Sequence, residues 1–163
     1  PFISICEPRP VQERLPILIG GSGRTKTLRT VARYADQWNG YGDPDRIAEV
    51  SGWLRERCEE VGRPFDSIKR TVTMDVVIRD TTAEARTAYG ELAAFQGIPV
   101  ARAGSDDAER GLSAGGPPAT VAAHLARLAE LGIAEVMWIF RSPWDLETIR
   151  RVGEVRSLLG ALA

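Results

Sequence analysis

The chain reads Leu15-Pro-Ile-Leu-Ile-Gly-Gly-Ser-Gly-Arg24 and continues into Thr25-Lys-Thr-Leu-Arg-Thr-Val-Ala-Arg-Tyr-Ala-Asp36. A short apolar run ends in glycines and a helical pattern follows at once, which predicts a strand, a tight turn and a helix N-terminus. The free N–H groups and the dipole of such a terminus favour a phosphate or a carboxylate, and glycine lets the backbone approach it closely. The stretch is therefore either an anion-binding turn or a plain connection between strand and helix.

Length and composition are those of an ordinary globular domain. The chain has 163 residues, 44% of them hydrophobic and 26% charged, so we interpret residues 1–163 as a single domain. A net charge of -1 gives no electrostatic reason to bind nucleic acid or an anionic membrane, and no apolar run approaches the ~20 residues that span a bilayer. Cys6 and Cys58 match no metal spacing and no disulfide framework, so we expect no metal site and a cytoplasmic location.

Apolar runs alternate with helical patterns along the chain. We expect strands over residues 16–19, 37–41, 71–78 and 135–140, the first of them buried on both faces. We expect helices over residues 25–35, 44–61, 82–95, 118–131 and 143–162, and a long loop over 97–116. Asp43 is suited to capping the second helix, Pro44 to its first turn, and Gly62 and Gly132 to helix ends.

Four strands, each followed by a helix, predict a parallel sheet with its strands in sequential order. A complete (β/α)₈ barrel needs about 250 residues. The chain is therefore either a small open α/β sheet or half of a barrel. It has no initiator methionine, and we expect it to be a fragment of a longer barrel domain.

Four segments, in this order along the chain, carry a resemblance to a known family. They are Pro10-Val-Gln-Glu-Arg-Leu-Pro-Ile-Leu-Ile-Gly-Gly-Ser-Gly23, then Thr27-Leu-Arg with Ala32-Arg-Tyr-Ala-Asp-Gln-Trp-Asn39, then Cys58-Glu-Glu-Val-Gly-Arg-Pro64, and last Gly116-Pro-Pro-Ala-Thr-Val-Ala-Ala-His-Leu125 with Leu131-Gly-Ile133. Together they resemble the bacterial luciferase-like monooxygenase family, and most closely its branch that uses the deazaflavin coenzyme F420. Pro117 replaces the usual Thr and Ala119 the usual Glu, which weakens a helix cap but not the placement.

The resemblance implies a (β/α)₈ TIM barrel in which the four expected strands are strands five to eight. The chain would then be the C-terminal half, and its α/β fold would lack the N-terminal half. The resemblance also implies F420 or FMN as the cofactor. Its tail and ring edge would lie against the glycine turn, and Trp38 and Asn39 would lie at the active face of the barrel. The residues expected at the cofactor are Gly20, Gly21, Ser22, Gly23, Trp38 and Asn39. Catalytic residues are unknown, because the family's active-site histidines lie in the missing half.

Three functions are compatible with these features. The first is part of a flavin- or F420-dependent oxidoreductase or monooxygenase that transfers hydride to, or activates oxygen on, a small organic substrate. The second is a non-catalytic half-barrel that binds a phosphate-bearing ligand or serves as an oligomerisation module. The third, a self-contained hydrolase or transferase, is disfavoured because the sequence has no Gly-x-Ser-x-Gly elbow and its single histidine has no evident partner.

An isolated half-barrel leaves its inner face and two sheet edges uncovered. We expect an apolar inner face formed by Ile17, Ile19, Met74, Val76 and Met137, or by their neighbours in the strand alternation. A second copy of the chain or the missing N-terminal half is expected to cover it.

Four other residues have side chains that are candidates for a site. We interpret His124, the only histidine, as a packing or surface residue of its helix. Trp144 follows the last strand and is suited to a pocket wall. Arg141 is suited either to pairing with a phosphate or an acidic tail or to a surface ion pair, and Trp138 could face either the barrel interior or the helices.

Overall fold

The computed structural model describes residues 11–98 and 112–160. The elements follow in the order β1 (Leu18–Gly20), α1 (Thr27–Tyr34), β2 (Gln37–Tyr41), α2 (Pro44–Glu60), η1 (Phe65–Ser67), β3 (Lys69–Ile78), α3 (Thr82–Phe95), β4 (Ala114–Gly116), α4 (Pro118–Glu130), β5 (Glu135–Ile139) and α5 (Leu146–Gly160). The predicted alternation of strands and helices is confirmed. Cys6 and most of the expected 97–116 loop lie outside the described residues.

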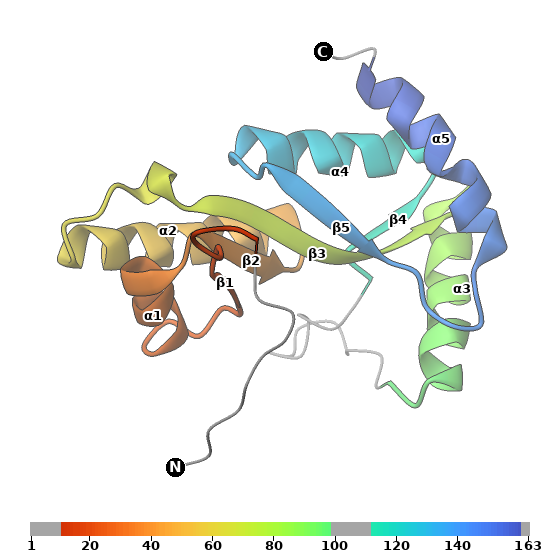
Figure 1. Cartoon of the computed structure of the whole chain (residues 1–163). Coiled ribbons are helices and arrows are strands. Elements are labelled where there is room, and N and C mark those ends of the chain that lie inside the picture. The colour runs from red at the N-terminus through yellow and green to blue at the C-terminus, as the bar shows by residue number, and fades with distance from the viewer. Residues whose placement is uncertain (1–10, 99–111, 161–163) are drawn as a thin grey trace.

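The sheet is parallel throughout its described strands, as predicted. β1 pairs with β2, β2 with β3, and β3 with β5, so the four predicted strands stand in sequential order. Figure 1 shows the long strand β3 in the middle of the molecule, with β2 and β5 on its two sides. The short strand β4, which pairs with the last three residues of β3, was predicted as loop. Its sequence Ala-Gly-Gly has no strand propensity, and it is a strand only because β3 offers unpaired backbone groups there.

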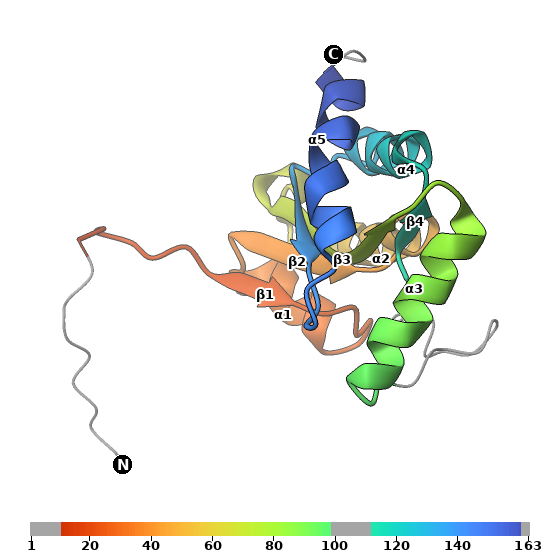
Figure 2. The same cartoon turned by 90° about the vertical axis from the view of Figure 1, so that its right-hand side faces the viewer.

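Helices α1, α2, α4 and α5 cover one face of the sheet and form the main core with it. The core contains the largest fully buried side chain, Trp38, together with Met74, Val76 and residues of α1, α2, α4 and α5. A second, smaller cluster packs α3 onto Val77, at the far end of β3. Figure 2 shows α3 standing apart from α4 and α5.

Helix boundaries follow the predicted signals closely. The Asp43 carboxylate accepts a hydrogen bond from the backbone N–H of Arg46 at 2.9 Å, and Pro44 begins α2. Gly62 and Gly132 follow α2 and α4 with φ of +67° and +76°, where glycine is favoured. Two predicted starts were too early, since α1 begins at Thr27 and α5 at Leu146.

The first strand differs from its prediction. Residues 16–19 were expected to form a strand buried on both faces, but β1 is Leu18–Gly20, and Ile17 and Leu18 are about half exposed. Among the described residues β1 pairs only with β2. Within the described residues, β1 is therefore an edge strand.

The predicted apolar inner face is also corrected. Ile19, Met74 and Val76 pack with the helices instead. Because paired residues in parallel strands point to the same side, the register places their alternating neighbours together on the opposite face. We call this the polar face, and it carries Asn39, Tyr41, Thr71, Thr73 and Asp75, with Met137 as an apolar member.

Candidate functional site

The carboxyl ends of the strands bring the predicted glycine turn and the polar face to the same edge of the sheet. The turn follows β1, Asn39 and Tyr41 end β2, Asp75 lies near the end of β3, and Arg141 follows β5. In parallel α/β folds this edge is where ligands bind. The structure therefore gathers the side chains of four separate elements at one place.

The glycine turn is a compact strand-to-helix connection held by backbone hydrogen bonds. The N–H of Gly21 donates to the carbonyl of Asn39 at 3.1 Å, and the N–H of Leu28 donates to the carbonyl of Gly23 at 3.0 Å. Gly21 has φ of +115°, which a residue with a side chain rarely adopts. A Cβ on Gly23 would lie 2.8 Å from the hydroxyl oxygen of Thr27. A side chain at Gly23 would thus collide with Thr27, and one at Gly21 would strain the backbone.

The N-terminus of α1 beside this turn has no side-chain cap and no acidic residue in its first turn. Its free N–H groups and dipole are suited to an anion. Ser22 is half-buried, whereas Gly21 and Gly23 are exposed at the surface. These features agree with an anion-binding turn but are equally those of a plain turn, so cofactor contact by Gly20, Gly21, Ser22 and Gly23 stays a prediction.

Trp38 is hydrogen-bonded to the glycine turn. Its indole N–H donates to the carbonyl of Gly21 at 2.9 Å. Its ring is fully buried on the helix side of the sheet, against the position of Gly40 and close to Ile47. Trp38 therefore contacts the predicted site through its hydrogen bond to the glycine turn. A role for Trp38 in cofactor binding stays a prediction.

Asn39 lies on the polar face and is fixed by two threonines of β3. Its amide nitrogen donates to the hydroxyl of Thr71 at 2.9 Å, and the hydroxyl of Thr73 donates to its amide oxygen at 3.0 Å. Thr71, which is 1% exposed, in turn donates to the carbonyl of Trp38 at 3.1 Å. This network orients the amide group of Asn39, and its role as a cofactor residue is likewise a prediction.

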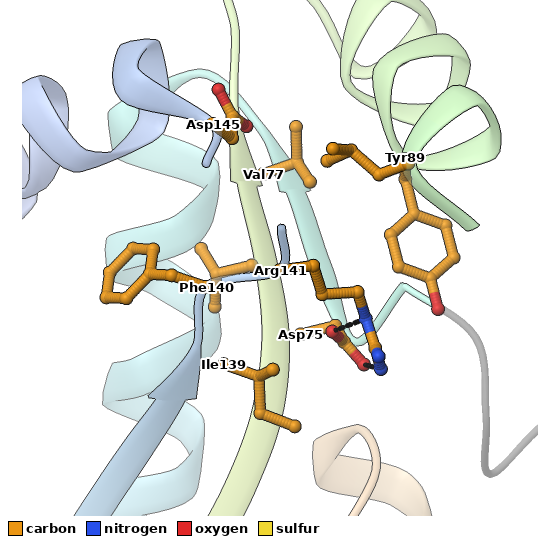
Figure 3. A pocket seen from close by; sticks show the side chains of 9 residues that line it. Asp75, Val77, Tyr89, Ile139, Phe140, Arg141 and Asp145 are labelled. Atoms are coloured by element: carbon orange, nitrogen blue, oxygen red, sulfur yellow. Dashed lines mark hydrogen bonds and ion pairs between the residues drawn. The ribbon is translucent and has the colours of Figure 1, made fainter. Parts of the chain in front are cut away.

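A buried carboxylate organises the end of the polar face. Asp75 is 2% exposed, and Arg141 binds both of its oxygens, with Nε at 2.6 Å and Nη2 at 2.7 Å. The hydroxyl of Tyr41 also donates to this carboxylate. Figure 3 shows Asp75 and Arg141 pointing toward one another, with Tyr89 of α3 beside them. An ion pair was one of the two roles predicted for Arg141, but at the surface, whereas its partner Asp75 is buried and was not predicted.

The charged cluster alters the protonation of its members. Burial, and then the hydrogen bond to Asp75, raise the pKa of Tyr41 above its ordinary value, so the phenol stays protonated as a donor. The hydrogen bond to Asp75 raises the pKa of Arg141. A cavity of about 10 Å³ beside the cluster is lined by Asp75, Tyr89 and Arg141 and has room for about one water molecule. The cluster can therefore orient and donate hydrogen bonds, while its charges compensate one another.

The remaining candidates lie elsewhere. His124 of α4 is half-buried, burial lowers its pKa, and its Nε2 atom has no hydrogen-bond partner among the described residues. Trp138 packs with the helix-side core, and Trp144 is 64% exposed just after β5. Within residues 11–98 and 112–160, no group of three or more metal-ligating side chains is found, and no helix has the length and apolar character needed to cross a membrane.

Comparison with solved structures places this fold among larger enzymes. The coenzyme F420 dependent tetrahydromethanopterin reductase from Methanopyrus kandleri matches with a TM-score of 0.54 and 19% identity over 76% of this chain and 44% of its own. The EDTA monooxygenase EmoA from Chelativorans sp. BNC1 matches with a TM-score of 0.61 and 16% identity over 90% of this chain and 44% of its own.

A third solved structure, the riboflavin lyase RcaE with modified FMN and riboflavin, matches with a TM-score of 0.60 and 18% identity over 88% of this chain and 42% of its own. The chain thus spans less than half the length of each. At these identities the likeness shows the fold alone, which is part of a luciferase-like TIM barrel, as predicted.

Sequence comparison gives the family directly. None of the curated proteins matches the chain in sequence. The family profile described as luciferase-like monooxygenase, however, matches residues 6–110. This match covers well over half of the chain and includes the glycine turn, Trp38, Asn39 and Asp75, which shows that the chain belongs to the luciferase-like monooxygenase family.

Proposed function

We propose that the chain is the cofactor-binding half of a flavin- or F420-dependent oxidoreductase or monooxygenase that acts on a small organic substrate. The observation that carries this proposal is the glycine turn with its uncapped helix N-terminus, beside a polar sheet face at the carboxyl ends of the strands. Family membership supports it, as do the matched structures whose names include F420 or FMN.

The residues present fit such a cofactor. The turn would hold a phosphate of its tail through the backbone N–H groups at the uncapped N-terminus of α1. Asn39 and Tyr41 would face the ring from the polar face. The bound cofactor would supply the hydride or oxygen chemistry, and the protein would bind it, orient it and exclude water. Tyr41 and Arg141 are the hydrogen-bond donors beside the polar face, and both are held by Asp75.

We further propose that the two open edges of the sheet are covered by an N-terminal half or by a second copy of the chain. At one edge Leu15, Ile17 and Leu18 are about half exposed, and at the other Met137 is 37% exposed. Unpaired strand edges with apolar side chains favour association. This covering would also enclose the polar face and so complete the site.

The Gly23→Val variant tests the cofactor proposal. The added Cβ would lie 2.8 Å from the Thr27 hydroxyl oxygen and so displace the turn. The affinity for FMN or F420 is therefore expected to fall at least about tenfold, the loss of one charge-assisted hydrogen bond of roughly 1.5–3 kcal/mol. Absorbance or fluorescence titration of the protein from the complete reading frame measures this affinity. Gly21 is less suitable, because its φ of +115° adds backbone strain to any substitution.

Gly52→Ala is the matched control, because a Cβ at this position in α2 meets no atom within 4 Å. It should leave cofactor affinity unchanged. If Gly23→Val folds, as judged by circular dichroism, and binds the cofactor with wild-type affinity, the turn is only a connection and the proposal fails.

A further inference from the structure

A second concave surface lies outside the polar face, between α3 and the loop that joins β5 to α5. Ala88, Glu91, Leu92 and Phe95 lie on one side of α3, at spacings of three and four residues, and face Pro143 and Trp144 of the loop. A hydrogen bond of 2.7 Å from Gln96 to the carbonyl of Ser142 holds the helix and the loop together. We call this surface the α3–loop groove. Its volume of about 350 Å³ lies in the range of small-molecule sites.

The groove exposes two large aromatic rings. Phe95 is 73% exposed and Trp144 is 64% exposed. Rings of this size are ordinarily among the more buried side chains, and two of them at one concave surface mark a binding site more than a solvated surface. Their faces carry negative quadrupole potential, which attracts cations.

The charges of the groove also favour a cation. Arg79 contributes no free positive charge, because it pairs with Asp145 at 3.0 Å and with Glu147 at 3.3 Å. It also donates to the carbonyl of Ile78 at 2.7 Å and to the hydroxyl of Thr148. Glu91 has no ion pair or hydrogen bond within the described part of the chain, so the uncompensated charge in the groove is negative.

We propose that the α3–loop groove binds a small organic cation with an aromatic or aliphatic body, recognised by the Glu91 carboxylate and by the rings of Phe95 and Trp144. The volume suits one such molecule, and the apolar side chains of Ala88 and Leu92 contact its body. This site goes beyond the proposed function, because its occupancy requires neither cofactor nor turnover.

The test uses two probes that share a ring and differ in charge, benzyltrimethylammonium and benzenesulfonate, at constant ionic strength. Binding is followed by NMR through the backbone amides of residues 88–95 and 144–146 and the indole N–H of Trp144. The cation should give saturable shifts at these positions, and the anion should give none. In Glu91→Gln its dissociation constant should rise about threefold, as for an exposed charge pair, and in Trp144→Ala about fivefold or more.

Glu130→Gln, on the distant end of α4, removes the same charge outside the groove and should leave the dissociation constant unchanged. Three results would overturn the proposal: equal binding of cation and anion, unchanged affinity in both groove variants, or no saturable shift with the cation. Shifts at the same residues that depend on protein concentration without any probe would identify a second copy as the occupant, and would also overturn it.

Discussion

Replacing Asp75 with alanine is expected to lower the free energy of unfolding by about 3 kcal/mol, because it removes one partner of a largely buried ion pair. Asp75 is 2% exposed, and the side chain of Arg141 is 18% exposed. Without the carboxylate, Arg141 loses two charge-assisted hydrogen bonds and Tyr41 loses its acceptor. Urea denaturation followed by circular dichroism measures the change.

Asp45→Ala provides the matched comparison, since Asp45 pairs with Arg127 at 2.6 Å but is 83% exposed. Exposed pairs contribute about 0–1 kcal/mol, so this variant should lose at most that amount. The double variant Asp75→Ala with Arg141→Ala should be less destabilised than the sum of the two single variants, because the two side chains interact directly. Equal losses in Asp75→Ala and Asp45→Ala would show that the buried cluster is not a structural anchor.

Trp38→Ala is expected to be the other severe change, with a loss of about 3–5 kcal/mol, the usual cost of deleting a buried aromatic ring. The ring is fully buried in the main core. Trp53→Ala serves as the comparison, because Trp53 only packs on the edge of this core, between the guanidinium groups of Arg24 and Arg46. Thermal and urea unfolding of the two variants should give clearly different stabilities.

Trp38→Phe separates the ring from its hydrogen bond. Phenylalanine keeps most of the buried surface but leaves the Gly21 carbonyl without its donor, at an expected cost of about 1 kcal/mol. Because the glycine turn then loses its support, cofactor affinity should fall as well. A Trp38→Phe variant with unchanged cofactor affinity would show that the indole contributes only to the core.

The sequence predicted well those features that depend on local chemistry. The starts of α2 and α4 follow from Asp43, Pro44 and Pro118, and the ends follow from Gly62 and Gly132. The strands β2, β3 and β5 are recognisable because each is a β-branched or aromatic run between helical patterns. The resemblance to the family then predicted that these elements form the C-terminal half of a barrel.

Features that depend on neighbours in space were predicted less well. The apolar run at β1 predicted a buried strand. Its burial depends on a neighbouring strand at its other edge, and the described residues contain none there. The prediction did not decide which face of β3 packs on the helices, although the alternation of Thr71, Thr73 and Asp75 was visible in the sequence. A carboxylate inside a strand was the signal that could have identified the polar face.

The buried cluster could not have been assembled from the sequence. Asp75, Tyr89 and Arg141 come from different elements, and only their packing brings them together. The α3–loop groove could not have been assembled from the sequence either. Trp144 was expected at a pocket wall, but the α3 residues that line the groove with it have the pattern of an ordinary helix face. Pattern analysis finds the residues that begin and end elements, and it does not find contacts between distant ones.

Hydrogen–deuterium exchange tests the central claim, that the carboxyl ends of these strands form a cofactor site, most directly. The protein from the complete reading frame would be compared with and without saturating FMN or F420. The account predicts slowed exchange for the amides of residues 20–28 and 39–42 with one of the two cofactors, while the amides of α4 stay unchanged. No change with either cofactor, or protection confined to the helix-covered face, would contradict it.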